Sequence, residues 1–200
     1  MTISRKFLKL GKWLLILTGI IILILFVLFT YQTKVTKNVD TYIYELPFAK
    51  GTSHRIVQGY GGLFSHSHIA ALDFEMPVGT SVYAAREGKV YSYKDNSSEG
   101  GYVSSYNGKA NYLIIQHNDG SFGCYWHLKE NGVLVKKGYV SKGQKIGLSG
   151  ATGLVIKPHL HFSVKRKLTY DMDSFVQTKF KTKDGILLLD DWETYERPFD

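Results

Sequence analysis

The sequence predicts a mostly antiparallel β-sheet domain preceded by one N-terminal transmembrane helix. Two observations predict this fold class. A long apolar run occupies residues 13–31, whereas the rest of the chain alternates short β-branched or aromatic runs with Gly, Asn and Asp. Helical periodicity is absent outside the apolar run. With 200 residues, the chain has room for one domain of ordinary size and attached segments.

The apolar run at 13–31 predicts a membrane anchor. It contains no charged residue, and it is long enough to cross the roughly 30 Å hydrocarbon core of a bilayer. Residues 1–12 hold four basic residues and no acidic one, so the positive-inside rule predicts a cytoplasmic N-terminus and an extracytoplasmic remainder. A cleaved signal peptide is the alternative, although the run is unusually long and residues 29–33 lack a small-x-small cleavage pattern.

The rest of the chain divides into a linker, a central domain and a C-terminal extension. Residues 32–52 are predicted to be a polar linker with one apolar patch at 42–48. Runs rich in β-branched and aromatic residues predict strands at 81–85, 89–93, 111–117, 121–128, 144–148 and 159–165. Asn118-Asp119-Gly120 is typical of a hairpin turn. The polar loop at 94–108 is either a solvated hairpin tip or one wall of a substrate groove.

Residues 168–200 form the C-terminal extension. Two further strand patterns occur there, at 175–181 and 185–189. We expect them to pack on the central domain as extra strands.

Several histidines and one aspartate point to a metal site. Residues two apart project from the same face of a strand, so His159 and His161 can act together. Asp73 is flanked by apolar residues on both sides, and a carboxylate in such a place requires a partner or a metal. A hydrolytic zinc site usually uses three His, Asp or Glu ligands and leaves one position open for water. One histidine of the His66/His68 pair, Asp73 and one histidine of the 159/161 pair would supply such a set.

The remaining histidine of the 159/161 pair and His127 would then be available for proton transfer and for stabilising an oxyanion. His54 and His117 are interpreted as structural. Cys124 is the only cysteine, so no disulfide can form within the chain. Its odd separation from His127 on a predicted strand places the thiol on the opposite face, which makes it a poor ligand candidate.

The central domain resembles a known family in six motifs that occur in the family's order. These motifs are Gly59–His66, Ala71–Thr80 with Val82–Val90, Asn111–His117, Tyr125–Leu128, Lys142–Gly153 and Pro158–Phe162. Residues 53–167 are similar to the lysostaphin-like (LytM-type) zinc metallopeptidases, most of which cut peptide cross-bridges or stems of bacterial peptidoglycan. The resemblance implies His66, Asp73 and His161 as zinc ligands and His127 and His159 as catalytic histidines.

The first motif departs from the family's commonest form, His-x-x-x-Asp. His66 precedes Asp73 by seven residues and His68 precedes it by five, so a regular strand would point either histidine away from the aspartate. We therefore expect a bulge or short loop between them. A Phe-Ser-His start followed by a longer loop also occurs in relatives and favours His66, with His68 as the alternative first ligand.

Charge and motif content exclude several other classes. Beyond the four basic residues of the N-terminal segment, 21 Lys and Arg face 17 Asp and Glu, a mild net charge of about +4. The basic residues are scattered and form no nucleic-acid module, so no nucleic-acid partner is expected. The His-Glu-x-x-His and Gly-x-Ser-x-Gly signatures of other hydrolases are absent.

The sequence therefore predicts a membrane-anchored zinc endopeptidase that hydrolyses peptidoglycan outside the cytoplasmic membrane. The predicted organisation is a cytoplasmic N-terminus at 1–12, an anchor at 13–31, a linker at 32–52, a peptidase domain at 53–167 and an extension at 168–200. The alternative is a catalytically silent wall-binding module that activates a separate hydrolase. A structural zinc protein is less well supported, because structural zinc sites usually close all four positions with Cys and His.

Overall fold

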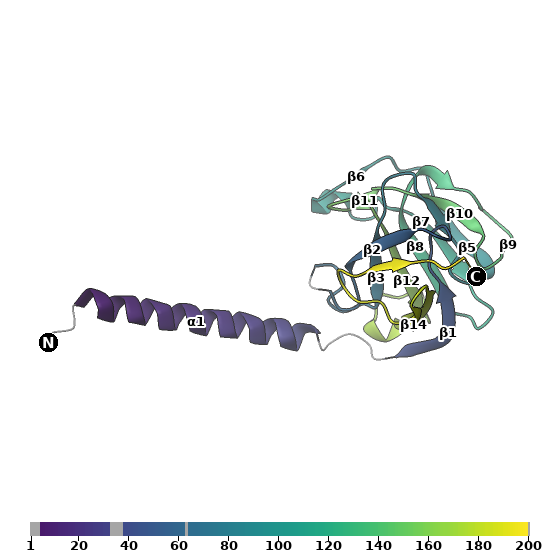
Figure 1. Cartoon of the computed structure of the whole chain (residues 1–200). Coiled ribbons are helices and arrows are strands. Elements are labelled where there is room, and N and C mark those ends of the chain that lie inside the picture. Colours follow the sequence, from purple (N-terminus) through teal and green to yellow (C-terminus); the bar gives the residue numbers. More distant parts are fainter. Residues whose placement is uncertain (1–4, 33–37, 63, 200) are drawn as a thin grey trace.

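The computed structural model describes residues 5–32, 38–62 and 64–199 (Figure 1). Residues 1–4 of the predicted cytoplasmic segment and residues 33–37 of the predicted linker lie outside this range. The described chain contains one long helix, two short 3₁₀ turns and a set of mostly short strands. Their order along the chain is α1 (Arg5–Gln32), β1 (Val39–Glu45), β2 (Ser53–Gln58), β3 (Ala71–Glu75), β4 (Ser81–Tyr83), β5 (Gly88–Lys94), β6 (Gly100–Gly101), η1 (Ser104–Tyr106), β7 (Asn111–Gln116), β8 (Phe122–Val133), β9 (Tyr139–Val140), β10 (Lys145–Ser149), β11 (Gly153–Leu154), β12 (His159–Lys165), η2 (Met172–Ser174), β13 (Phe175–Thr182), β14 (Gly185–Leu187) and β15 (Thr194–Glu196).

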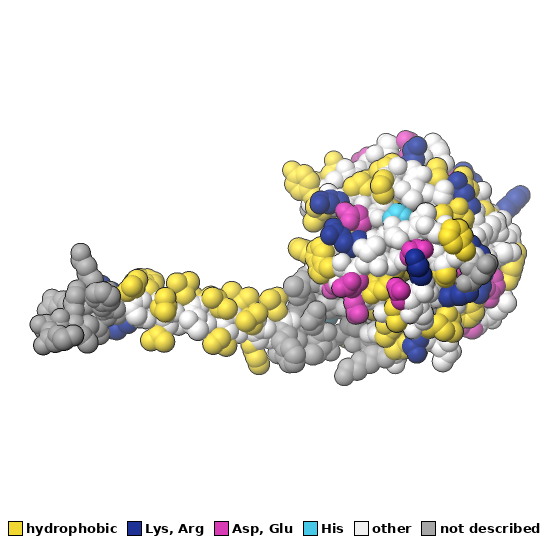
Figure 2. All heavy atoms as spheres, in the orientation of Figure 1, with side chains coloured by type: hydrophobic (Ala, Val, Ile, Leu, Met, Phe, Trp, Pro, Cys, Tyr) yellow, Lys and Arg dark blue, Asp and Glu magenta, His cyan; other side chains and the backbone are white. Residues whose placement is uncertain are grey.

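Helix α1 covers the apolar run at the N-terminus. Its segment Lys9–Leu28 has a mean hydropathy of 2.6, and none of it is buried against other parts of the structure. Figure 2 shows hydrophobic side chains along both visible sides of this helix. These properties are shared by a membrane span and a signal sequence, and they do not fit a helix in the core of a domain.

The main sheet is mostly antiparallel, as the sequence predicts. Its strands follow the order β15-β2-β3-β12-β8-β7-β5-β9, so β12 lies between β3 and β8 (Figure 1). Strand β10 pairs with β4 and β8. The parallel pairs within the described chain are β1 with β13 and β11 with β6. This order places the His-x-His strand β12 next to the strand that carries Asp73.

The C-terminal extension adds strands to this sheet, which confirms the expectation from its sequence. Strand β13 pairs with both β12 and β1, β14 pairs with β13, and β15 pairs with β2. The hairpin turn between β7 and β8 is also present. Gly120 adopts a positive φ of 83°, and the Asp119 carboxylate accepts hydrogen bonds from the backbone and hydroxyl of Ser121.

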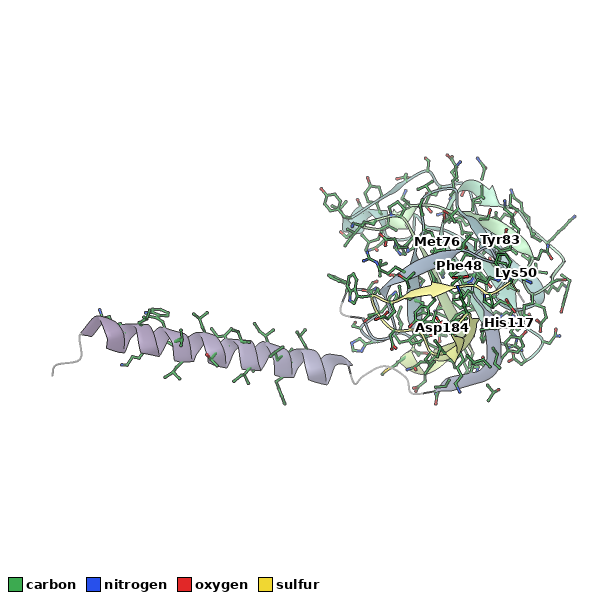
Figure 3. The ribbon with its side chains drawn as sticks, in the orientation of Figure 1. Phe48, Lys50, Met76, Tyr83, His117 and Asp184 are labelled. Atoms are coloured by element: carbon green, nitrogen blue, oxygen red, sulfur yellow. The ribbon has the colours of Figure 1, made fainter. Side chains whose placement is uncertain are left out.

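The structure differs from the predicted linker at residues 39–48. This stretch begins with β1, and the side chains of Tyr44, Leu46 and Phe48 are completely buried. Phe48, which is labelled in Figure 3, packs edge-on against Phe74 of β3, with 5.8 Å between ring centroids. The physical reason is the apolar patch at 42–48, which gains more from burial than a polar tether would. Residues 39–48 therefore belong to the folded domain.

A buried polar network fastens β1 to the rest of the domain. The Tyr44 hydroxyl donates a hydrogen bond to Asp40 Oδ2 over 2.8 Å, and Arg86 lies 4.0 Å from the centre of the Tyr42 ring. Arg86 Nη1 also forms an ion pair of 3.0 Å with Asp119. Strand β1 is thus held by polar contacts as well as by its apolar side chains.

Burial of Leu46 leads to a stability prediction. Leu46→Ala should lower the free energy of unfolding by about 2–5 kcal/mol, because it leaves a cavity in a packed core. Ile43→Ala is the matched control on β1, where the side chain is 40% exposed, and it should change stability by less than about 0.5 kcal/mol. Urea unfolding followed by tryptophan fluorescence measures both. Equal small effects would show that this segment does not contribute to the core.

Candidate active site

Three potential metal-binding atoms converge beside the centre of the sheet. His66 Nε2 lies 3.2 Å from Asp73 Oδ1 and 3.1 Å from His161 Nδ1, and His161 Nδ1 lies 2.9 Å from Asp73 Oδ1. The three atoms thus form a nearly equilateral triangle. Among the residues that the structure describes, this is the group of His, Cys, Asp and Glu side chains close enough to hold one ion.

Strand register brings two of these residues together. His161 of β12 is the direct partner of Asp73 of β3, and directly opposed residues on antiparallel strands project from the same face. His159 lies two residues before His161 and so shares that face. The sheet thus places both histidines on the side of the aspartate.

His66 reaches the cluster from a turn that precedes β3. The amide of Ile69 donates to the carbonyl of His66 over 3.0 Å, and the strand begins only at Ala71. The turn therefore accounts for the odd spacing between His66 and Asp73, as expected from the sequence. His66 is completely buried, whereas the alternative, His68, is exposed and lies outside the cluster.

Backbone and side-chain contacts orient the first two residues. His66 Nδ1 lies 2.9 Å from the carbonyl oxygen of Gly59. Because a carbonyl only accepts, Nδ1 carries the proton, and the lone pair of Nε2 points into the cluster. Gln58 Nε2 donates to the second oxygen of Asp73 over 3.2 Å, which leaves Oδ1 facing the histidines.

The electrostatics of the cluster favour an ionised Asp73 carboxylate and a neutral His161 ring. Burial alone would raise the pKa of Asp73, but its contacts with His161 and His66 outweigh burial and hold that pKa well below its usual range. Burial lowers the pKa of His161 despite the neighbouring carboxylate. The cluster thus offers two imidazole nitrogens and one carboxylate oxygen as possible metal ligands.

This donor set fits a zinc ion. Tetrahedral zinc with bonds of about 2.0–2.2 Å separates its ligand atoms by roughly 3.3–3.6 Å, close to the spacing of the triangle. Two imidazole lone pairs and an anionic oxygen crowded into a buried place also repel one another unless a cation or proton lies between them. Sites with two histidines and one carboxylate, with an open fourth position, are typical of hydrolytic zinc enzymes.

His127 and His159 lie next to the cluster, and both bond a backbone carbonyl through the same ring nitrogen. His127 Nδ1 donates to the Thr152 carbonyl over 2.7 Å, and His159 Nδ1 donates to the Lys157 carbonyl over 2.8 Å. In both residues Nε2 is therefore left to act as a proton acceptor. The two ring centroids are 4.7 Å apart, and His159 Nε2 lies 3.6 Å from Asp73 Oδ1.

The environment of His127 keeps it neutral. Burial, followed by the neighbouring His159 and His161, lowers the pKa of His127 to about 3. Its backbone has a positive φ of 63°, which is uncommon for a residue with a side chain. Residues held in such conformations by their surroundings cluster at functional sites.

Sequence reasoning missed the network that holds His127 in place. Asn111 is completely buried; its side-chain amide donates to the carbonyls of Ser97 and Leu128, and its backbone amide donates to the Thr152 hydroxyl. The Thr152 hydroxyl in turn donates to the Leu128 carbonyl over 2.8 Å. The sequence signal for this network is Asn111, a polar residue at the start of an otherwise largely apolar strand.

A groove with a volume of about 530 Å³ opens over these residues. Asp73, His127 and His159 line it together with exposed apolar side chains, which are Phe64, Tyr102, Leu154, Ile156 and Trp192. Tyr102 comes from the polar loop at 94–108, so this loop forms part of a wall. Of the two interpretations left open for the loop, the structure supports the groove wall.

Comparison with known proteins identifies the family. The model of peptidase family M23 matches residues 67–173, more than half of the chain. The chain belongs to this family. The match confirms the resemblance to lysostaphin-like peptidases, and it begins one residue after His66 and ends before β13.

Several bacterial proteins are similar in sequence to this M23 chain. It is 43% identical over 93 residues to peptidoglycan DD-endopeptidase ShyA of Vibrio cholerae, an alignment covering 46% of this chain and 19% of the relative. It is 39% identical over 109 residues to lysostaphin of Staphylococcus simulans, covering 52% of this chain and 20% of lysostaphin. The chain thus spans about a fifth of the length of the curated relatives that it matches.

Two solved structures are also similar to this chain. The catalytic domain of lysostaphin from Staphylococcus simulans is 30% identical, with 62% of this chain and 86% of that domain covered and a TM-score of 0.45. A zinc-containing peptidase from Vibrio cholerae is 34% identical, with 64% of this chain and 35% of that chain covered and a TM-score of 0.40.

The position of His66 leads to a prediction about metal binding. His66→Ala should abolish tight zinc binding, because it removes one of three converging ligand atoms. His68→Ala is the matched control and should bind zinc like the parent chain, because His68 lies outside the cluster. Competition with a chromophoric chelator measures both affinities. Loss of binding in the His68 variant instead would reverse the assignment of the first ligand.

Proposed function

We propose that this chain is a zinc metalloendopeptidase that hydrolyses peptide bonds in bacterial peptidoglycan cross-bridges or stems. The observation that carries the proposal is the convergence of His66, Asp73 and His161 beside a groove, which Asp73 lines together with His127 and His159. Membership of family M23 supports it, and so do relatives that are peptidoglycan endopeptidases.

The proposed zinc ligands are His66 Nε2, Asp73 Oδ1 and His161 Nδ1. When bound, a zinc ion supplies Lewis-acid chemistry that polarises an amide carbonyl and lowers the pKa of water. Asp73 contributes a full negative charge to this site, since its pKa lies well below neutrality. A single carboxylate does not cancel the charge of a divalent ion, so the site would be positive overall once the metal is present, which favours an electron-rich carbonyl oxygen in the groove.

His127 and His159 are proposed to move the proton. Each ring has Nδ1 committed to a backbone carbonyl, so Nε2 is the atom that can accept a proton from the attacking water. The same nitrogen can then return the proton to the leaving amine. Once protonated, the ring also becomes a hydrogen-bond donor and a positive charge beside the developing oxyanion.

The groove is proposed to bind an extended peptide. It is lined largely by apolar side chains, with Asp73, His127 and His159 among its polar groups, a distribution typical of substrate clefts. A peptide segment seated there would bring its carbonyl carbon between the proposed zinc ligands and the two neighbouring histidines. Binding of the peptide would also exclude water from these polar groups and so strengthen their electrostatic interactions.

The N-terminal helix is proposed to anchor the enzyme in the cytoplasmic membrane. Its apolar segment is long enough to span a bilayer, and basic residues precede it. In this arrangement residues 1–12 are cytoplasmic, 13–31 cross the membrane, and the domain that begins at β1 faces the wall. The few residues between α1 and β1 would keep the groove close to the outward-facing surface of the cytoplasmic membrane.

The first experiment is digestion of purified peptidoglycan by the zinc-loaded protein, with and without a chelator, followed by mass spectrometry. We expect new amine ends at one peptide position, and chelation should abolish them because the proposed reaction needs the metal. Unchanged muropeptides despite bound zinc would contradict the proposal. They would support a silent wall-binding module that activates another hydrolase.

A variant separates catalysis from metal binding. His159→Ala should retain zinc but lose about 10²–10⁴-fold in kcat, the usual contribution of a general acid or base. The control is His54→Ala, because His54 of β2 has its Nδ1 bonded to the Glu75 carbonyl and does not line the groove. Full activity of a zinc-loaded His159 variant would rule out the assigned role.

A further inference from the structure

The segment between β14 and β15 runs beside the proposed active site. Its backbone is fastened to β2 by two hydrogen bonds, from Trp192 N to the Ile56 carbonyl over 2.8 Å and from Ile56 N to the Glu193 carbonyl over 2.9 Å. Strand β15 then continues as a neighbour of β2. This segment lies beyond residue 173, where the family match ends.

Asp191 of this segment contacts the residue that orients His66. The backbone amide of Gly59 donates a hydrogen bond to Asp191 Oδ1, and the carbonyl of the same Gly59 accepts the hydrogen bond from His66 Nδ1. The contact is close: a Cβ at position 59 would come within 2.5 Å of Asp191 Oδ1. Because position 59 is a glycine, the Asp191 carboxylate can bond its backbone amide, and the carbonyl of the same residue bonds the His66 ring.

This arrangement has the form of an outer support for a metal ligand. The imidazole that presents Nε2 to the cluster is fixed through its other nitrogen, and the acceptor of that bond is itself fixed by an anionic side chain. Gly62 N also donates to the Gly59 carbonyl over 3.2 Å. Both backbone polar groups of Gly59 are therefore hydrogen-bonded, the amide to Asp191 and the carbonyl to Gly62 and His66. Asp191 thus limits where the Gly59 carbonyl, and with it His66, can lie.

Trp192, the next residue, forms part of the groove wall. Its side chain is 61% exposed, lines the groove and has Arg55 at 5.8 Å from its ring. Arg55 is in turn paired with Glu75 of β3 over 3.0 Å. The backbone of Trp192 has a positive φ of 67°, which is costly for a bulky side chain. A large apolar ring held in a costly conformation at a groove edge indicates a contact surface for a ligand.

We propose that residues 191 and 192 complete the active site from outside the family core: Asp191 is a positioning residue for His66, and Trp192 determines specificity by contacting aliphatic parts of the peptide substrate. This inference rests on the proposed function, because it takes His66 as a zinc ligand and the groove as the substrate site. It assigns the C-terminal extension a role in catalysis as well as in packing.

The positioning role is tested by zinc affinity in the full chain, with no need for turnover. Asp191→Ala should weaken zinc binding about 10–100-fold, the usual effect of losing an outer support. Asp191→Asn should retain most of the affinity, because its amide oxygen can still accept from Gly59. Glu193→Gln is the matched control, since Glu193 is exposed and contacts β2 through its backbone.

Urea unfolding of the same variants separates positioning from a general structural role. A merely structural Asp191 would lower the unfolding free energy and leave the zinc affinity of the folded protein unchanged, and this result would overturn the inference. If Asp191→Ala does not fold, Asp191→Ser replaces it, because the shorter hydroxyl weakens the contact with Gly59 without leaving an apolar side chain. Unchanged zinc affinity in a folded serine variant would equally overturn it.

Trp192 is tested by kinetics on purified peptidoglycan. Trp192→Ala should raise KM about two- to tenfold, the range expected for an aromatic contact, with kcat and zinc affinity unchanged. Tyr139→Ala is the control, because Tyr139 is an exposed aromatic residue on β9 and does not line the groove. An unchanged KM would overturn the specificity role.

The outcomes distinguish this inference from the proposed function. If the parent chain cuts peptidoglycan but Asp191→Ala binds zinc as tightly as the parent, only the positioning role fails. If the parent chain binds zinc and does not cut, the proposed hydrolase fails. The zinc affinities still decide the role of Asp191, and sedimentation with peptidoglycan, weakened by Trp192→Ala, then decides the role of Trp192.

Discussion

A buried carboxylate between two imidazoles is the constraint on which the rest of this structure depends. Asp73 remains ionised although it is buried, because its contacts with His161 and His66 offset the cost of its burial. Such an arrangement requires the two strands β3 and β12 to keep one register, since a slip by one residue would turn Asp73 or His161 to the opposite face. The sheet therefore has little freedom to vary at this point.

Backbone carbonyls give the site its shape. His66, His127 and His159 each bond through Nδ1 to a carbonyl oxygen, of Gly59, Thr152 and Lys157 respectively. His66 Nε2 and His159 Nε2 both lie within 3.6 Å of Asp73 Oδ1, although one residue comes from a turn and the other from the start of a strand. Carbonyl acceptors do not titrate, so they fix the ring tautomers over a wide range of pH.

Much of the fold could be predicted from the sequence because its signals are local. Short β-branched and aromatic runs bounded by turn residues located β4, β5, β7, β8, β10, β12, β13 and β14, and the resemblance in six motifs named the site residues that the structure brings together. The segment at 39–48 was assigned to a linker because its apolar patch is short. Its partner, β13, lies more than a hundred residues later, and local patterns carry no information about such pairing.

The sequence by itself determined the family, the chemistry of the donor set and the apolar helix, since these depend on residue type and on spacing along the chain. The tertiary structure alone decided between His66 and His68 as the member of the cluster, because a turn cancels the alternation that a strand would impose. It alone brought Asp191 to Gly59 and Trp192 to the groove. Those contacts join segments about 130 residues apart, and only the closure of the sheet by β15 makes them neighbours.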